Sequence, residues 1–582
     1  MTRIFNEPSD FKNEVIDGFT AAYGRYVKRV PNASGFVRKD GPRAGKVSLV
    51  VGGGSGHYPS YSGATGRGFA DGCVLGDVFT SPSNEQVYRI GRAASGGGGV
   101  VLSFGNYAGD RLNFAAAAER LVSEGIDTRI VYVTDDIASA KPDDRLDRRG
   151  IAGTFTVYKI GGAAADLGED LDTVERVMQK ANAATFSYGV AFEGCTFPGQ
   201  KDPLFHVEQG KMEFGLGIHG EPGIDTVDMM PARELATNLV ERLLAERPED
   251  ADGRVAVLVN GLGATKYEEL FLLYGHISTL LDEAGLTPVL PEVGELVTSL
   301  DMRGCSLSLT WLDDELERFW TAPADTASFR RGDISTLPDY DAAEDQAKEA
   351  SESEDAEQAS EESRRAARVV VDALNAMRDT VLEHEEELGR IDAVAGDGDH
   401  GVGMVRGSRA ACAAGESAHE DEAGAGDVLG AAGDAFSDKA GGTSGILWGI
   451  FLSTIGATLG NTDEVTPAQV AAGVRRGAET IQRLGKAELG DKTMLDALLP
   501  FVDELDARVE SGDEIDSAWN AAAEKAVEAA RQTADLTPKI GRARPLAERS
   551  VGTPDAGATS MGMVVTAVGA ILSESCSDTK SE

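Results

Sequence analysis

Three carboxylates gather in one short, glycine-rich segment and are candidates for metal chemistry. Asp392, Asp397 and Asp399 lie within eight residues, and the glycines between them let the backbone fold around a central ion. Mg²⁺ prefers oxygen ligands and usually shares them with the phosphates of a substrate. The spacing fits one or two Mg²⁺ ions that neutralise the phosphates of a nucleotide. The alternative is a polar turn closed by Asp-Gly.

Further loops in the same half place small, polar residues where helices are expected to begin. Loop 440–445 contains Thr443 and Ser444, directly before an apolar helix expected at Ile446–Leu459. Free amides at a helix start bind anions, so both hydroxyl residues are candidate phosphate ligands, with a simple helix cap as the alternative. The loop lacks the lysine of a Walker A motif. The other loops that add to a predicted nucleotide site are 491–493, 541–544 and 552–560.

His57, His219 and Asp110 are the candidate catalytic residues of the other half. All three lie in glycine-containing loops, and those of His57 and Asp110 follow apolar, strand-like runs. An imidazole and a carboxylate can act as an acid–base pair on a hydroxyl, and His219 can act as a nucleophile or bind an electrophile. A lone histidine also commonly has a structural, hydrogen-bonding role. No GxGxxG with a partner acid is evident, which disfavours a dinucleotide cofactor.

The balance of charge restricts the partners of this chain. Its 582 residues contain 96 Asp and Glu against 55 Lys and Arg, a formal net charge of −41. Such a surface repels phosphate backbones and anionic lipid, so no nucleic-acid or membrane partner is expected. Anionic ligands must be held locally by amides, a few cations or bound metal. Hydrophobic residues make up 42% of the chain, which excludes a wholly disordered protein.

Cysteine use and the lengths of the apolar runs predict a soluble, cytoplasmic protein. The five cysteines are scattered without a CxxC pair, which is typical of a reducing compartment rather than of a disulfide frame or zinc site. The N-terminus has no apolar signal-peptide core. The nearest approach to a membrane span, Ile446–Leu459, is short and contains Gly, Ser and Thr.

Two different patterns of elements position these residues. Before residue 339, β-branched runs that end in glycine or polar clusters alternate with helical stretches, which predicts parallel sheets with ligands at the strand ends. This α/β half is expected at 1–338, with subdomains of about 1–188 and 189–338. The expected strands include 47–51, 100–104, 129–133 and 255–259, and the expected helices include 111–123 and 171–184.

The second pattern follows an acidic linker expected at 339–365. Residues 339–363 hold eleven acids and one lysine, a net charge of −10, and no branched aliphatic residue. Such a segment buries too little apolar area to offset its ordering entropy. Beyond it, apolar residues from Val370 to Leu388 recur at the spacings of one amphipathic helix. Further helices are expected, among others at 467–484 and 515–533. Residues 366–576 are therefore predicted to be an all-helical domain with its polar loops gathered at one end.

The motifs of both halves resemble those of the dihydroxyacetone kinase family. GGGSGH, GDVFTSPS, NYAGDRLNF, RRGIAGT and GIHGEPG are similar to its substrate half, and GDGDHG, GGTSG, GDKTMLDAL and GRARPLAERSVGTPDAGATSM to its nucleotide half. The resemblance covers most of residues 10–335 and 366–572. Both halves lie in one chain, as in the ATP-dependent type of the family. The resemblance implies an ATP-dependent kinase of a short ketose, an eight-helix barrel in the nucleotide half and a homodimer.

The resemblance also implies roles for individual residues. His219 would form a hemiaminal with the substrate carbonyl carbon, which selects ketones and aldehydes over glycerol. Asp110 and His57 would handle the proton of the hydroxyl that attacks the γ-phosphate of ATP. The carboxylates of the acidic segment would hold two Mg²⁺ ions that bridge the ATP phosphates. The remaining implied ligands are Gly54, Gly56, Ser81 and Asn106 for the substrate, and His400, Thr443, Ser444, Asp491, Arg542, Asp555 and Gly557 for the nucleotide.

Gly403 and Ala556 depart from the usual residues of the family in the nucleotide half, and two further departures lie in the substrate half. The chain has Tyr58 where the family usually has the glutamate of GHEP, and Gly105 where it usually has a lysine. Loss of the lysine removes a charge beside Asp110, so a larger and less polar pocket is expected, with Tyr58 as a stacking wall. Both departures resemble the branch that acts on four-carbon ketoses such as erythrulose. The alternative is a non-catalytic ketose sensor of the same family, which the intact catalytic residues argue against.

Overall fold

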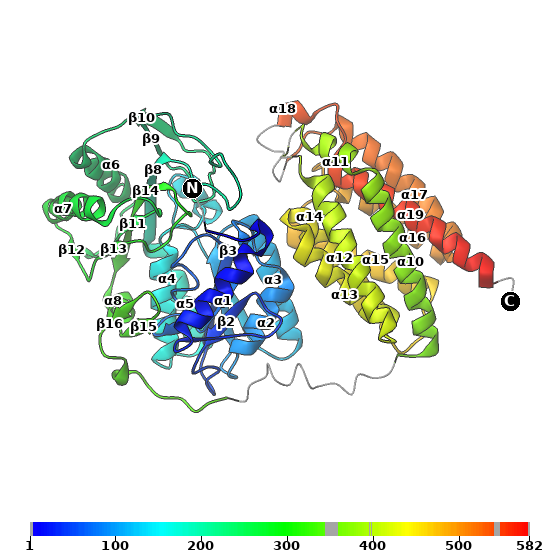
Figure 1. Cartoon of the computed structure of the whole chain (residues 1–582), viewed down its shortest axis with the longest axis horizontal. Coiled ribbons are helices and arrows are strands. Elements are labelled where there is room, and N and C mark those ends of the chain that lie inside the picture. The colour runs from blue at the N-terminus through cyan, green and yellow to red at the C-terminus, as the bar shows by residue number, and fades with distance from the viewer. Residues whose placement is uncertain (1–3, 344–358, 395, 397, 540–546, 580–582) are drawn as a thin grey trace. The chain divides into compact units, whose positions relative to one another are not determined.

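The computed structural model describes residues 4–343, 359–394, 396, 398–539 and 547–579. The chain forms two compact units, Met1–Glu352 and Ser353–Glu582 (Figure 1). The first unit mixes strands and helices, whereas the described part of the second contains helices and no strand. The predicted fold class, an α/β half followed by an all-helical half, is confirmed.

A six-stranded sheet with the order β1-β2-β5-β3-β6-β7 lies in the N-terminal part of the first unit. β3 runs parallel to β5 and β6, and β6 runs parallel to β7, as expected, while β1 and β2 join antiparallel at one edge. The predicted strands 47–51, 100–104 and 129–133 correspond to β3, β6 and β7. The strands are β1 Val27–Arg29, β2 Gly35–Arg38, β3 Ser48–Ser55, β5 Gly72–Val78, β6 Val100–Gly105 and β7 Thr128–Val133.

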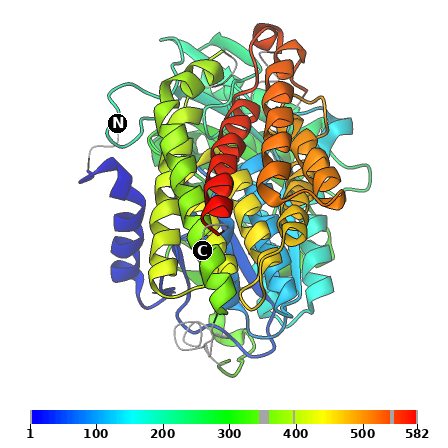
Figure 2. The same ribbon diagram turned by 90° about the vertical axis from the view of Figure 1, so that its right-hand side faces the viewer.

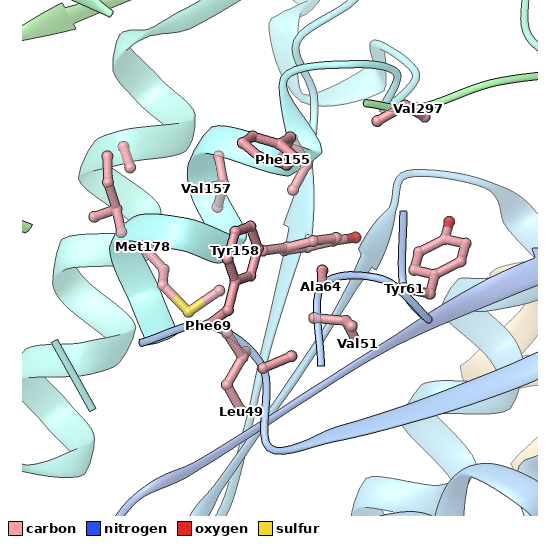
Figure 3. Packing of buried hydrophobic residues seen from close by; sticks show 14 of the residues in the cluster. Leu49, Val51, Tyr61, Ala64, Phe69, Phe155, Val157, Tyr158, Met178 and Val297 are labelled. Carbon is pink, nitrogen blue, oxygen red and sulfur yellow. The ribbon is translucent and has the colours of Figure 1, made fainter. Parts of the chain in front are cut away.

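Helices cover both faces of this sheet. The apolar sides of α2 and α3 pack on one face, and those of α4 and α5 pack on the other. Figure 3 shows part of the second interface, where Val157 and Met178 lie in the same cluster as Leu49 of β3. Burial on both faces explains why the strands read as continuous apolar runs. The helices are α2 Asn84–Ala94, α3 Ala108–Ser123, α4 Thr154–Asp166 and α5 Leu171–Ala184.

The second sheet of this unit is mainly antiparallel, so the prediction of parallel sheets was wrong here. Its order is β10-β9-β8-β14-β11-β12, and only β12 and β13 pair with β11 in parallel. A buried apolar strand has the same composition in a parallel and in an antiparallel sheet, so the sequence did not distinguish the two arrangements. The elements are β8 Thr185–Glu193, β9 Lys211–Phe214, β10 Asp225–Asp228, α6 Ala232–Leu244, β11 Arg254–Gly261, α7 Tyr267–Glu283, β12 Thr287–Pro288, β13 Glu292–Gly294 and β14 Arg303–Leu312.

Shorter elements complete the first unit. β4, β15 and β16 form a three-stranded sheet, which brings the end of the unit back to its N-terminal half. These elements, with the remaining helices and 3₁₀ turns, are η1 Pro8–Asp10, α1 Phe11–Tyr23, β4 Gly66–Arg67, η2 Pro142–Asp147, α8 Asp314–Thr321, β15 Ala324–Thr326, β16 Arg330–Arg331 and η3 Ile334–Thr336.

Long helices lie side by side in the second unit (Figure 2). The first begins inside the expected linker, because the Ser360 hydroxyl caps it by accepting from the Ser363 amide. It breaks at His384, so the single helix expected here is two. The elements are α10 Glu361–Glu383, α11 Glu385–Asp392, α12 His400–Glu420, α13 Ala425–Ala440, α14 Gly442–Leu459, α15 Pro467–Gly485, α16 Leu495–Glu510, α17 Ile515–Gln532, η4 Thr533–Asp535, α18 Ala547–Ser550 and α19 Ala556–Thr579.

The helices of this unit surround an apolar cavity of about 300 Å³. Its lining includes Trp448 and Phe451 of α14 and Val565 of α19. By length and composition alone, α14 and α19 are apolar enough to cross a membrane, a test that the core helices of soluble proteins also pass. Of the apolar windows in these helices, 56% and 44% respectively are buried inside the unit. Both helices line the apolar cavity, which accounts for part of their apolar character.

Candidate active site

The first three glycines of the GGGSGH motif, Gly52–Gly54, lie inside β3 and not in the loop where they were expected. An added Cβ at Gly52 would lie 2.4 Å from Val74 Cγ1, and one at Gly54 would lie 2.6 Å from the Thr80 amide nitrogen. The turn begins at Gly56, whose φ of +103° is rare for residues with a side chain. The glycines thus let β3 lie close to β5 and to the loop that contains Thr80, and the turn after β3 contains His57.

His57, His219 and Glu221 form a chain of close polar contacts. His57 Nδ1 lies 2.7 Å from the Thr298 carbonyl oxygen, and its Nε2 lies 3.0 Å from Nε2 of His219. Nδ1 of His219 lies 3.1 Å from a Glu221 carboxylate oxygen, and the His219 amide donates to the other oxygen at 3.0 Å. The Phe79 ring stacks on His57 with centroids 4.9 Å apart. The two imidazoles are therefore held in fixed orientations.

The hydrogen-bond partners determine which nitrogens carry protons. The Thr298 carbonyl can only accept, so neutral His57 is protonated on Nδ1 and presents Nε2 as an acceptor to His219. Burial, followed by the charge of His219, lowers the pKa of His57 to about 3, which keeps it neutral. Burial would raise the pKa of Glu221, but the hydrogen bond and charge of His219 lower it to about 2. The site can thus hold a cationic His219 ring against a carboxylate.

Asp110 and Tyr107, at the start of α3, present polar atoms that are buried and unsatisfied. Oδ1 of Asp110 and the Tyr107 hydroxyl have no hydrogen-bond partner among the described residues. Burial raises the pKa of Asp110 to about 6, a shift that Ser81 and the charge of His219 only partly offset. The Tyr107 ring lies edge-on to His219, with centroids 4.5 Å apart. Unsatisfied buried acceptors beside a candidate nucleophile suit a ligand with hydroxyl groups.

The other expected substrate ligands take different positions. Ser81 accepts a hydrogen bond from the Asn113 side-chain amide at 3.1 Å, which places it beside the helix that carries Asp110. The amide of Asn106 instead donates to the carbonyls of Leu146 and Arg148, at 3.0 and 2.7 Å. Its side chain thus holds the loop after β6 in place.

The two departures from the family pattern have different structural consequences. The Tyr58 side chain is 47% exposed, and its ring lies 6.2 Å from Phe19 of α1, so the expectation of a stacking wall on the pocket is not met. Gly105 ends β6, where an added Cβ would lie 3.0 Å from the Gly150 carbonyl oxygen and 3.1 Å from the Tyr107 ring. The absence of a side chain at residue 105 therefore leaves room for the Tyr107 ring beside His219.

Sequence reasoning missed several residues of this site. Glu221 was visible in the GIHGEPG motif two residues after His219, but its charge was not given a role. Phe79 and Thr298 carry no signal in the sequence, because an aromatic ring and a backbone carbonyl gain their roles only through the fold. Arg149 forms an ion pair with Asp136, and its Nη1 lies 3.8 Å from a carboxylate oxygen of Glu221.

In the second unit, His400 joins the starts of three helices. Ser560 donates to the Gly557 carbonyl at 3.0 Å, so its oxygen accepts from Nε2 of His400, also at 3.0 Å. Nδ1 of His400 then accepts from the Ser444 hydroxyl at 3.2 Å. Burial lowers the pKa of His400, against the charge of Asp392. The structure places this histidine as a neutral link between α12, α14 and α19.

The acidic segment is only partly within the described residues. Asp392 ends α11 and accepts from the Gly398 amide at 2.8 Å, and Asp399 precedes α12. Asp397 and Arg542, both expected ligands, lie outside the described residues. Within the residues that are described, no group of three or more His, Cys, Asp or Glu side chains is arranged as a metal site.

The remaining nucleotide loops meet near the start of α16. Asp491 accepts from the Glu488 amide at 2.8 Å, and Lys492 donates to the carbonyls of Leu536 and Ser550 at 3.1 and 2.7 Å. Burial raises the pKa of Asp555 to about 6. An added Cβ at Gly557 would lie 3.3 Å from Met494. Thr443 lies with Ser444 in the first turn of α14. The loops expected to gather at one end are therefore linked by direct contacts.

Comparisons with known proteins agree with this arrangement. The Dak1 domain family matches residues 17–328, and the DAK2 domain family matches residues 394–570. The chain belongs to the single-chain dihydroxyacetone kinase family, in its erythrulose kinase branch. It is 54% identical to a D-erythrulose kinase of Mycolicibacterium smegmatis over 97% of each chain. It is also 51% identical to an L-erythrulose kinase of Pectobacterium atrosepticum, over all of this chain and 98% of the relative.

Solved structures of this family support the same fold. The dihydroxyacetone kinase of C. freundii is 30% identical and covers 98% of this chain, with a TM-score of 0.52, and a second structure of it holds AMP-PNP and Mg²⁺. A dihydroxyacetone kinase operon co-activator matches with the same TM-score but covers only 55% of this chain. The predictions of family and of a kinase are confirmed.

Proposed function

We propose that this protein transfers the γ-phosphoryl group of ATP to a terminal hydroxyl of a short-chain ketose, erythrulose or dihydroxyacetone. The observation that carries the proposal is the placement of Asp110 and the His57–His219 pair in one buried site of the ketose-binding unit. The full-length similarity to kinases of both erythrulose enantiomers supports it. The departure at Gly105, which removes the long charged side chain of the usual lysine, favours a four-carbon substrate.

His219 would bind the ketose covalently. Its Nδ1 is engaged with Glu221, which leaves Nε2 as the nitrogen that attacks the carbonyl carbon. The neighbouring Nε2 of His57 is an acceptor and lies 3.0 Å away, so it can receive the proton of the attacking nitrogen and pass it to the carbonyl oxygen in the same step, without remaining protonated. This contact supports a role for His57 in the attachment of the ketose, whereas the resemblance implied a role at the hydroxyl that is phosphorylated.

Asp110 would act as the base for the hydroxyl that attacks phosphorus. Its Oδ1 is free to accept a hydroxyl proton, and its raised pKa of about 6 makes it a stronger base than an ordinary aspartate while it stays ionised at neutral pH. Gly54, Gly56 and Ser81 would also contact the ketose. Asn106 would contribute through the position of its loop.

The second unit would hold ATP. Asp392, Asp397 and Asp399 supply the hard oxygen donors that Mg²⁺ prefers, and bound Mg²⁺ neutralises phosphate charge during transfer. His400 keeps the starts of α12, α14 and α19 together, so that free amides of these helices face the phosphates. The other residues proposed to border the nucleotide are Thr443, Ser444, Asp491, Arg542, Asp555 and Gly557.

The assembly and setting of the enzyme are proposals of the same kind. We expect a homodimer in the cytoplasm that requires no nucleic-acid or membrane partner, since the net charge of −41 opposes both. The proposed boundaries are 1–338 for the ketose-binding domain, 339–365 for the linker and 366–576 for the ATP-binding domain.

A substrate panel tests the proposal. Initial rates of ADP formation with Mg²⁺-ATP are measured for dihydroxyacetone, D-erythrulose, L-erythrulose, glyceraldehyde and glycerol. We expect turnover with the ketoses, highest with an erythrulose, and none with glycerol, which has no carbonyl group. Phosphorylation of glycerol alone would contradict covalent capture, and ketose binding without ATP turnover would indicate a sensor.

A further inference from the structure

Glu221 holds His219 through both of its carboxylate oxygens. One oxygen accepts from the backbone amide of His219 and the other contacts Nδ1 of its ring. The two residues are separated by one glycine in the loop between β9 and β10. This double contact fixes the rotation of the imidazole, because the same carboxylate binds both the backbone and the ring.

We propose that Glu221 is a positioning residue for ketose capture, which directs Nε2 of His219 at the carbonyl carbon and serves as the counter-ion of the ring in the covalent adduct. The inference rests on the proposed covalent role of His219. The sequence around Glu221 does not distinguish it from an ordinary surface acid, whereas its two contacts with His219 do.

The chemistry of the adduct explains why a carboxylate is needed at Nδ1. In the capture step, Nε2 of His219 gives its proton to Nε2 of His57, and the freed lone pair forms the N–C bond. The π pair of the carbonyl group moves onto oxygen, which takes that proton from His57. A ring that carries carbon on Nε2 and a proton on Nδ1 has no neutral form unless it loses that proton. The ring is therefore a cation for as long as the ketose is attached, and an adjacent carboxylate stabilises it.

The other charged groups around the ring are committed elsewhere or neutral. Arg149 lies 3.8 Å from the Glu221 carboxylate but pairs at 2.8 Å with Asp136. His57 faces the opposite nitrogen and is neutral. Asp110 is near enough for the charge of His219 to affect it, but no hydrogen bond between the two is present in the described part of the chain. Glu221 is thus the carboxylate in direct contact with the nitrogen that keeps its proton.

The test compares three full-length proteins: wild type, Glu221→Gln and Glu213→Gln. Glutamine preserves the size and the acceptor oxygen of Glu221 but removes the charge. Glu213 is a matched control, because its carboxylate accepts from the Gly223 amide at 2.8 Å and so supports the same loop. Each protein is saturated with dihydroxyacetone labelled with ¹³C at the carbonyl carbon, at a pH of about 8.5, where an ordinary imidazole is neutral.

The measurement is the ratio of bound tetrahedral carbon to bound ketone carbon by NMR. Wild type and Glu213→Gln should show mostly tetrahedral carbon. Glu221→Gln should lower the ratio of tetrahedral to ketone carbon by about tenfold or more, because it removes a partly buried counter-ion of the ring. Glu221→Asp keeps the charge and should recover part of the loss. This partial rescue separates loss of charge from loss of the fold, which a thermal melt of each variant also checks.

Three results would overturn the inference. A ratio in Glu221→Gln equal to that of wild type would show that the ring needs no counter-ion. An aspartate variant no better than the glutamine variant would show that charge is not the cause. Absence of the tetrahedral signal in wild type would instead contradict the proposed covalent role of His219, so the two failures are distinguishable.

Discussion

Each unit of the molecule contains a histidine at its candidate site, partly buried in the first unit and buried in the second, and the two histidines have opposite surroundings. His219 faces a carboxylate on one side and a second imidazole on the other. His400 faces serine hydroxyls on both sides. The first environment can stabilise a cationic ring, whereas the second is satisfied by a neutral ring. A carboxylate partner thus suits a histidine that reacts, and hydroxyl partners suit one that holds helices together.

The same contrast applies to the carboxylates near the two histidines. Glu221 has a lowered pKa because His219 and Arg149 stabilise its charge, whereas Asp110 has a raised pKa because burial dominates. One acid is a permanent anion and the other is a base that can take up a proton near neutral pH. In the first unit, the surroundings of each carboxylate therefore decide whether it acts as a permanent counter-ion, as Glu221 does, or as a base, as proposed for Asp110.

Replacement of Asp110 should have the largest effect. Asp110→Asn removes the base and should lower kcat by about 10²–10⁴-fold, with a smaller change in the KM for ketose. Steady-state rates on the preferred ketose measure this, with Asp127→Asn, in the exposed loop before β7, as the control. A loss of less than about fivefold would show that Asp110 does not act as a general base.

Replacement of His219 should mainly affect binding. His219→Ala removes the covalent link and should raise the KM for ketoses by about a hundredfold, equivalent to about 3 kcal/mol, with a smaller loss in kcat. The KM for ATP should stay unchanged, because the proposed nucleotide site is in the other unit. If His219→Ala and Asp110→Asn change KM and kcat equally and only slightly, His219 is not the binding residue and Asp110 is not the catalytic one.

Replacement of His400 should change the KM for ATP and leave the KM for ketose unchanged. His400→Phe leaves the hydroxyls of Ser444 and Ser560 without their shared partner, and it should raise the KM for ATP by about tenfold. The KM for ketose should not change. The control is His419→Phe, near the other end of α12. A change in the KM for ketose of the same size would show that His400 is not confined to the nucleotide site.

The pH profile should sharpen the contrast between the carboxylates. Asp110 must be ionised to accept a proton, and its pKa is raised to about 6, so activity should be lost as the pH falls through 6 and should be about tenfold lower at pH 5. Glu221, with its pKa lowered to about 2, stays ionised over this range. Log kcat/KM measured from pH 4.5 to 8 checks this. An acid limb near pH 4 would indicate an unperturbed aspartate.

Much of the fold followed from local patterns. The β-branched runs that became β3, β6, β7 and β11 were found because strands buried on both faces are apolar throughout. The helices α14, α15 and α17 were located within a few residues, because their apolar residues recur at helical spacing. The antiparallel second sheet and the break at His384 were missed, since neither changes the composition of the elements involved.

The sequence by itself determined the two-part organisation, the family and the residue types at both sites, because glycines, histidines and carboxylates at fixed spacing retain their chemistry in any fold. Tertiary structure alone decided what each group does. It placed the Thr298 carbonyl on one imidazole and Glu221 on the other, and it turned Tyr58 toward α1 and Asn106 toward its own loop. Protonation and orientation depend on partners within about 3 Å, and those partners come from segments up to 241 residues apart in the chain.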